Sequence, residues 1–417
     1  MRTENLSYPD RSERNSQDDP LVVHGEAYEQ HLADRGYAAG YIKCCKSGVA
    51  HLSHWMRLTH KEASEVSEAL IAEFLDVHLP RCACGSVIHD RSSLSAALGH
   101  LLVALRATGV IPPRAVDLSP IGEELRCYDQ YMVEVRNLAP STRKDALRIV
   151  GCLLRSRFDD GCIDFTAIGA EHVRCFFAQQ AKLHKKPTSI GMVAASLRGY
   201  FRWRATLGDQ VHALVGVLAY PANWQLASLP KALNPDEVEQ LVASLGQIGP
   251  SMRRADAMVR CALDLGLRSA EVARLSLDDF DWRAATITLR GTKGRREDVM
   301  PLPASTGQAI AEYLRHERPT TKHRMVFARH IAPRERPVGS ALVCKTIRQA
   351  YARAGLQHTR SHLLRHTMAS RLLAGGSSLK EVADVLRHRS LNTTLVYAKL
   401  DSRSLNEVTL PWPGSAA

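Results

Sequence analysis

The stretch SHLLRHTMASRLLAGGSSLKEVADVLRHRSLNTTLVYAKL, residues 361–400, decides how the rest of the chain is interpreted. It places His362 and Arg365 three residues apart. A second histidine, His388, follows in a basic turn, and Tyr397 comes nine positions later. Residues three apart lie on one face of a helix, so His362 and Arg365 can reach the same ligand. The stretch therefore predicts a phosphate site with a nucleophile beside it.

The composition is that of a basic globular protein. The chain has 417 residues, of which 45% are apolar, so two or three domains could each bury a core. The formal net charge of +12 favours a polyanionic partner, because clustered Lys and Arg release counterions from phosphates. No apolar run approaches the ~20 residues of a membrane span, and residues 1–20 lack the apolar core of a signal peptide. We therefore expect a cytoplasmic, nucleoid-associated protein.

The apolar pattern divides the chain into five segments. Residues 1–20 are polar and predict a flexible tail. Apolar residues at spacings of three and four over 21–112, and again over 118–220, predict two helical domains. Residues 230–405 predict a third domain, and residues 406–417 a C-terminal tail. The predicted fold class is mainly α with a small antiparallel β-sheet.

The two N-terminal helical domains share short sequence matches. YEQHL at Tyr28 is echoed by YDQYM at Tyr128. LLVALRATG, ending at Gly109, is echoed by YFRWRATLG, ending at Gly208. The two domains could therefore be duplicates, although matches this short also arise by chance in helical sequences.

Local signals in the third domain predict where its elements begin and end. Asn234 before a proline, and Ser378 three residues before Glu381, are typical helix N-caps. Residues 285–290 alternate Thr and Ile or Leu and predict a strand, and residues 298–302 predict a second strand after a short loop. These strands are the only clear β signal in the sequence.

Upstream motifs supply the groups that a phosphodiester reaction at Tyr397 would need. Arg268 lies in LGLRSAEVARL with Glu271 one helical turn on, and Lys293 lies in RGTKGRRE between the predicted strands. A phenol with an ordinary pKa of about 10 needs nearby positive charge or a base. Guanidinium groups match the charge that develops on phosphate oxygens. Each motif alone is more often a solvated helix face or a core residue, so the specificity lies in the ordered set.

With this ordered set, residues 230–405 resemble the tyrosine recombinases, the family of phage integrases and Xer-type recombinases. The resemblance rests on GLRSAEVARLSLDDFDW and on the C-terminal stretch quoted first. Residues 118–220 more loosely resemble the family's helical core-binding domain. The resemblance implies a site-specific DNA recombinase or integrase, which a transposon could encode, that cuts and rejoins DNA through a 3′-phosphotyrosyl intermediate.

The resemblance also implies a role for individual residues. The implied catalytic groups, in chain order, are Arg268, Lys293, His362, Arg365, His388 and Tyr397, with Glu271 in support. The two arginines would clamp the scissile phosphate, and the lysine would donate a proton to the 5′ oxygen. The first histidine would assist proton transfer, the second would hydrogen-bond a phosphate oxygen, and the tyrosine would form the covalent bond. Where the family usually has glycine before the second histidine, this chain has Arg387, which would add charge near the phosphate.

The implied partners are double-stranded DNA target sites, with the protein acting as a homo-tetramer that could include other recombinase subunits. No membrane and no small-molecule substrate are expected. No cofactor or metal is expected either, because one phosphodiester is exchanged for a phosphotyrosine of similar energy and Arg and Lys neutralise the charge. In this family a C-terminal segment often docks on the neighbouring protomer, and residues 406–417 could do this or fold back on their own domain.

Two other functions fit parts of the sequence. A type IB topoisomerase-like enzyme, which nicks and reseals DNA, would use the same residues. A catalytically silent DNA-binding regulator is the alternative that is not an enzyme. The intact set of groups from Arg268 to Tyr397 argues against the regulator.

Basic side chains outside the predicted site are candidates for contacts to DNA phosphates, which position a protein without reading sequence. They are Arg143, Lys144, Lys185, Lys186, Arg202, Arg295 and Arg296. The neighbouring aromatic residues Phe201 and Trp203 are expected in the core rather than stacked on bases.

The ten cysteines are expected to be free thiols, because disulfides are rare in a reducing compartment. Cys82 and Cys84, with Cys44, Cys45 and His89, suggest a zinc site. However, the CxC spacing is not the usual CxxC, and no second pair follows. Ordinary thiols are therefore favoured, and the predicted set of metal ligands is none.

Overall fold

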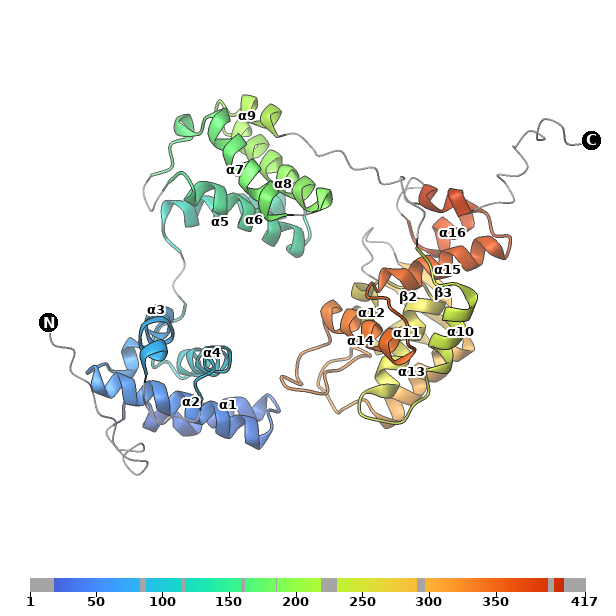
Figure 1. Ribbon diagram of the computed structural model, residues 1–417, viewed down its shortest axis with the longest axis horizontal. Coiled ribbons are helices and arrows are strands. Elements are labelled where there is room, and N and C mark those ends of the chain that lie inside the picture. Colours follow the sequence, from blue (N-terminus) through green and yellow to red (C-terminus); the bar gives the residue numbers. More distant parts are fainter. Residues whose placement is uncertain are drawn as a thin grey trace, which may run out of the picture. The chain divides into compact units, whose positions relative to one another are not determined.

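The computed structural model describes residues 19–82, 88–114, 117–158, 162–184, 186–218, 231–290, 297–388 and 394–400. Over these residues the chain is mainly helical with one three-stranded antiparallel sheet, as the sequence predicts (Figure 1). Contacts between residues define two compact units, one of residues 113–227 and one that combines residues 1–112 with 228–417. Among the helices of the described part, none has the length and apolarity that crossing a bilayer requires.

The described N-terminal residues form a helical bundle with its own apolar core. Its α-helices are α1 (Gly25–Asp34), α2 (Ala39–Leu58), α3 (Glu68–Glu73) and α4 (Arg91–Ala107). Helix α3 continues into a π-helical turn, η4 (Phe74–His78), and then a 3-10 turn, η5 (Leu79–Arg81). The Tyr28 hydroxyl on α1 donates a hydrogen bond of 2.9 Å to the Ala97 carbonyl on α4, which connects the first and last helices of the bundle.

Residues 113–227 form the second unit, again with a separate apolar core. Its helices are α5 (Pro120–Glu134), α6 (Pro140–Arg155), α7 (Ala170–Leu183), α8 (Pro187–Thr206) and α9 (His212–Val217). Phe201 and Trp203 on α8 are buried in this core, which confirms that they are not free to stack on bases.

Two features of the suggested duplication recur in the structure. Tyr28 on α1 and Tyr128 on α5 are both buried, and Tyr128 packs against aromatic rings of α8, as Tyr28 contacts α4. Gly109 and Gly208, which follow α4 and α8, both have positive φ, the conformation that favours glycine after a helix. Whether the two helix sets superpose stays a prediction.

The described residues from 231 onward form helices around a small sheet. The helices are α10 (Pro235–Ala243), α11 (Met252–Asp264), α12 (Ser269–Arg274), α13 (Ala304–His316), α14 (Ser340–Arg353), α15 (His362–Ala374) and α16 (Leu379–Val385), followed by the 3-10 segment η9 (Leu395–Leu400). Helix α11 is central, because it packs against α12, α13, α14 and α15. The predicted caps are present: the Asn234 side chain accepts from the Glu237 amide, and Ser378 from the Glu381 amide.

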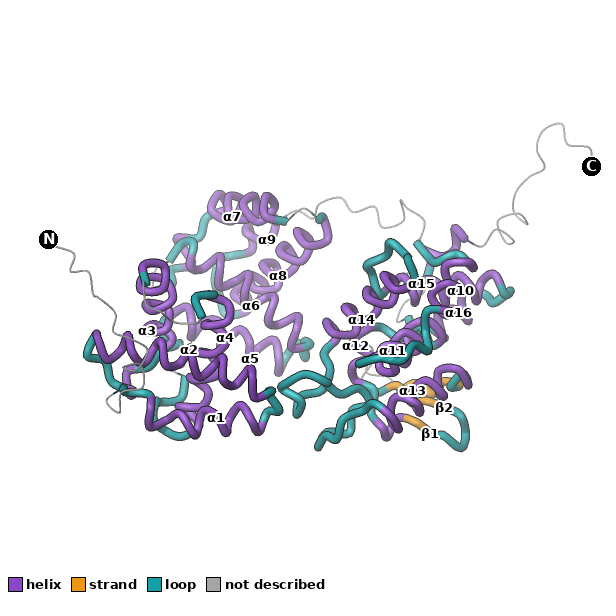
Figure 2. Tube along the Cα trace, turned by 60° about the horizontal axis from the view of Figure 1, so that its bottom comes forward, coloured by secondary structure: helices purple, strands orange, loops and turns teal. Residues whose placement is uncertain are grey.

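The sheet has the order β1-β2-β3, and its strands are orange in Figure 2. Its strands are β1 (Phe280–Asp281), β2 (Thr286–Leu289) and β3 (Asp298–Pro301). Strands β2 and β3 pair antiparallel, with Ile287 opposite Met300, as the sequence predicts. Strand β1 was not predicted, because two residues are too few to show alternation.

Gly266 shapes the turn between α11 and α12, two residues before Arg268, the N-cap of α12. Its φ is +59°, a left-handed conformation that glycine adopts without strain. A Cβ at this position would lie 2.6 Å from Met368 Sδ and 3.0 Å from Leu386 Cδ2. The turn can therefore pack this closely against α15 and the end of α16 only because residue 266 lacks a side chain.

Candidate active site

The guanidinium of Arg365 connects three segments of the chain. Arg365 lies on α15, is 4% exposed, and donates to the Gly266 carbonyl at 2.5 Å and to the Leu386 carbonyl. Burial, with Arg268 and Arg387 nearby, lowers the pKa of Arg365 to about 9, so the group stays charged at neutral pH. A guanidinium has five N–H donors, and so donors remain for a phosphate.

Arg268 and Glu271 form the contact that the sequence predicts. Glu271 accepts from the Arg268 amide at 2.8 Å and from Arg268 Nη1 at 2.7 Å, within the first turn of α12. Its second partner is Arg387, whose Nη2 donates to the carboxylate at 3.0 Å. Burial raises the pKa of Glu271, but Arg387 and Arg268 outweigh this effect and lower it below its usual value. Glu271 is therefore a carboxylate shared by two arginines.

Arg387 is expected to add charge near the phosphate, and its charge already acts on Arg365 and His388, whose pKa values it helps to lower. Its side chain is 4% exposed and pairs with the equally buried Glu271, which also pairs with Arg268, so the two arginines and one carboxylate together keep a net positive charge. Arg387 has a φ of +56°, in the left-handed region that L residues rarely adopt. Glycine adopts this conformation readily, which explains why the resemblance leads one to expect glycine at position 387.

Tyr397 lies in η9 with its ring in an apolar cluster. It is 1% exposed and packs with Ala369, Val382 and Leu386. Its hydroxyl makes a hydrogen bond of 2.6 Å with Nδ1 of His366. Burial raises the pKa of Tyr397 to about 12, with Arg365 and Arg268 acting in the opposite direction. The phenol is therefore protonated at neutral pH, and the His366 imidazole is the titratable side chain in contact with its hydroxyl.

His366 is a site residue that the sequence patterns did not single out. Burial, followed by the neighbouring His362 and Arg365, lowers its pKa, so the ring is neutral at pH 7 and able to accept a proton. A signal was available, because His366 comes four residues after His362 and both lie on α15. Its contact with Tyr397 joins residues 31 positions apart, which no local pattern indicates.

The two histidines that the sequence predicts are both neutral at pH 7. Nδ1 of His388 makes a hydrogen bond of 2.7 Å with the Thr394 hydroxyl. Burial, then Arg365 and Arg268, lowers the pKa of His388 to about 4. Burial, then the same two arginines, also lowers the pKa of His362. At pH 7 these two imidazoles therefore add no positive charge to that of the neighbouring arginines.

The remaining predicted site residues fall into three groups. The first group lies outside the described residues and consists of Lys293, Lys185, Arg295 and Arg296. Nη1 of Arg143 donates to both carboxylate oxygens of Asp129 at 3.0 Å, so the charge of Arg143 is already paired. Lys144, Lys186 and Arg202 are exposed and available to a ligand.

A buried tyrosine beside a neutral histidine, with two arginines nearby, defines a nucleophilic site for phosphate chemistry.

Residues 231–403 match the Phage integrase family. A candidate integrase/recombinase of Sinorhizobium fredii, y4rA, is 33% identical over 403 residues, which cover 95% of this chain and 96% of that protein. The tyrosine recombinase XerD of Listeria innocua is 31% identical over 239 residues, or 56% of this chain and 78% of XerD.

Among solved structures, the XerH site-specific recombinase bound to a palindromic difH substrate aligns with a TM-score of 0.51. The alignment covers 81% of this chain and 93% of XerH at 19% identity, which is a likeness of fold. The similarity to y4rA extends over nearly the whole of both sequences. The chain belongs to the phage integrase family, the tyrosine recombinases, which are DNA breaking and rejoining enzymes.

We predict that Glu271→Ala lowers the free energy of unfolding by about 3–5 kcal/mol, because it leaves the buried Arg387 without a counter-charge. Glu312→Ala is the matched control, since Glu312 faces Arg253 at 3.9 Å with a side chain 43% exposed and should cost less than about 1 kcal/mol. Urea unfolding of both variants measures the difference. Equal losses would contradict the proposed role of Glu271.

Proposed function

We propose that this recombinase cuts each DNA strand at a specific site by attack of Tyr397 on the scissile phosphate. The observation that supports the proposal is the 2.6 Å hydrogen bond between the Tyr397 hydroxyl and His366, in a site whose two arginines act electrostatically on the phenol. Nucleophile, base and arginines all come from one chain. Cleavage would therefore need no side chain from a partner to complete these groups.

The chemistry can be written as one exchange of bonds. His366 takes the phenolic proton as the Tyr397 oxygen bonds to phosphorus, and the bond from phosphorus to the 5′ oxygen breaks. The departing 5′ oxygen takes a proton, which the family resemblance assigns to Lys293. Arg268 and Arg365 stabilise the negative charge on the non-bridging oxygens. A 5′ hydroxyl attacking the phosphotyrosine reverses these steps and rejoins the DNA.

The burial of Tyr397 requires a movement on DNA binding. At 1% exposure its hydroxyl cannot contact a phosphate from solution. The cluster that covers it is small and includes Leu386, at the C-terminal end of α16. Displacement of η9 from this cluster would expose the phenol, and the same step would couple cleavage to correct DNA binding.

The proposed partner is duplex DNA, bound by a homo-tetramer that joins two sites. The XerH structure, which contains a palindromic difH substrate, supports duplex DNA as the ligand of this fold. In this chain the exposed basic residues Lys144, Lys186 and Arg202 belong to the helical unit of residues 113–227. We propose that this unit and the helical bundle of residues 21–112 contact the DNA backbone, as separate domains from the catalytic domain.

Tyr397→Phe tests the nucleophile. With a nicked suicide substrate made from DNA at the ends of the protein's own genetic neighbourhood, the wild type should form a covalent complex and the variant none. DNA binding in a mobility-shift assay should change less than about twofold. Tyr351→Phe is the matched control, because Tyr351 is also buried and loses only a 3.3 Å bond to the Arg360 carbonyl. Covalent capture by Tyr397→Phe would refute the assignment.

A pH profile tests the base. Because the pKa of His366 lies below its ordinary value of 6.5, the ring stays neutral as pH falls from 8 to 6.5 and takes up a proton only at lower pH. The rate of covalent capture should therefore hold constant from pH 8 to 6.5 and fall below it. His366→Gln can still hydrogen-bond the phenol but cannot take its proton, so capture should slow by about 10²–10⁴-fold. Wild-type rates in His366→Gln would exclude this role.

A further inference from the structure

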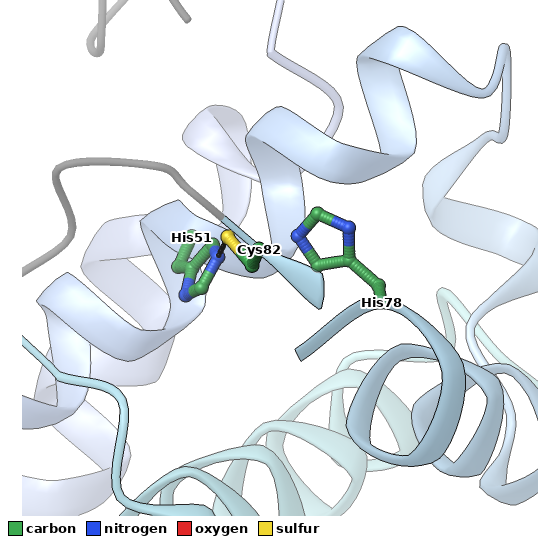
Figure 3. A group of neighbouring side chains, drawn as sticks. All are labelled: His51, His78 and Cys82. Carbon is green, nitrogen blue, oxygen red and sulfur yellow. Dashed lines mark hydrogen bonds between the residues drawn. The ribbon is translucent and has the colours of Figure 1, made fainter. Parts of the chain in front are cut away.

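The N-terminal helical bundle contains a group of metal-binding side chains far along the sequence from the catalytic residues. It consists of His51 on α2, His78 at the end of the π-helical turn η4, and Cys82 just after η5 (Figure 3). One ligand atom from each residue lies within 4.8 Å of the other two. His51 Nε2 and Cys82 Sγ are 3.3 Å apart. Figure 3 shows the His78 ring facing this pair.

The ligand types and distances fit a zinc ion. Two imidazoles and a thiolate are a set that zinc prefers, with bonds of about 2.0–2.3 Å. Tetrahedral bonds of that length bring ligand atoms to about 3.5 Å from one another. The 3.3 Å between His51 Nε2 and Cys82 Sγ is close to this value, and a ligand atom of His78 lies within 4.8 Å of both.

The nearest further histidine that could complete the site is His89, which lies outside the group of three. Its ring centroid is 6.0 Å from that of His51, and the His78 centroid is 5.5 Å from that of His51. His89 is exposed and lies in the segment just before α4, so its side chain can turn toward the group. The sequence pattern named Cys82 and His89 but not His51 and His78, which the fold brings close to Cys82.

The surroundings suit a structural ion. His51 and His78 both contact Phe74, with ring centroids 5.0 and 5.3 Å away, and Trp55 lies 5.8 Å from His78. An apolar shell of this kind limits solvent access to a metal and strengthens its bonds. The same contacts would also occur if the histidines were only core residues, and this alternative is an outcome of the test below.

The oxidation state of Cys82 controls whether the site can form. The described cysteines other than Cys82 are free thiols, as the sequence predicts, whereas Cys82 is disulfide-bonded, contrary to that prediction. Zinc binds the thiolate. A thiol or phosphine reductant supplies the two electrons, and solvent the two protons, that convert a disulfide to two thiols. The site therefore belongs to the reduced protein.

We propose that His51, His78 and Cys82, completed by His89, bind one zinc ion that fastens η4 and η5 to α2. The π-helical turn η4 supports this assignment, because irregular turns of this kind often occur at functional sites. It is the element that carries His78. The ion would stabilise the bundle that precedes the catalytic domain, and its binding does not depend on the chemistry at Tyr397.

The test uses the full chain, reduced with a phosphine, stripped with a chelator and titrated with Co²⁺ as a probe. We expect one Co²⁺ per chain, with thiolate-to-metal charge-transfer absorption and tetrahedral d–d bands, displaced by Zn²⁺. Zinc should also raise the melting temperature of the stripped protein. Absence of thiolate charge transfer, or an unchanged melting temperature, overturns the proposal and leaves the histidines as core residues.

Variants identify the ligands. Cys82→Ser and His78→Asn should each abolish the cobalt spectrum and lower bound zinc, measured by mass spectrometry, from one to near zero per chain. The controls are Cys44→Ser, an exposed free thiol on the same helix as His51, and His60→Asn, an exposed histidine with positive φ that Asn tolerates. Both controls should keep the metal. Equal zinc content in Cys82→Ser and the wild type would show that the ion binds elsewhere in the chain. If a variant fails to fold, the cobalt spectrum of the wild type decides whether a thiolate binds the metal.

Discussion

The active site depends on one buried guanidinium. Arg365 donates to the carbonyls of Gly266 and Leu386, and it thereby connects the turn before α12, helix α15 and the end of α16. A buried charge is costly unless hydrogen bonds compensate it, so these three segments must keep their positions for the fold to persist. Arg268 follows the first segment and His388 the last. The residue proposed to bind the phosphate thus also brings the other phosphate-binding groups together.

A shared carboxylate complements this arrangement. Glu271 compensates Arg268 and Arg387, so the site concentrates three arginines around one acid. The net positive charge suits a phosphodiester, whose binding would add the missing negative charge. It also acts on Tyr397, where Arg365 and Arg268 partly offset the rise in pKa that burial causes. Binding of substrate and activation of the nucleophile therefore use the same arginines.

Local signals in the sequence predicted most of the catalytic fold and part of its site. The helix caps at Asn234 and Ser378, the two alternating strands and the contact between Arg268 and Glu271 all depend on residues a few positions apart. The bond between His366 and Tyr397 depends on how α15, α16 and η9 pack, which the sequence alone does not indicate. The buried position of Arg387 was missed for the same reason, because its partner lies 116 residues away.

We predict that Tyr397 is the one residue joined covalently to the DNA after cleavage. The most direct measurement is tandem mass spectrometry of the covalent complex trapped on a suicide substrate, digested with a protease and a nuclease. The predicted result is a nucleotide joined through its 3′ phosphate to the phenolic oxygen of Tyr397. Attachment to another tyrosine or to a serine, or through a 5′ phosphate, would contradict the account.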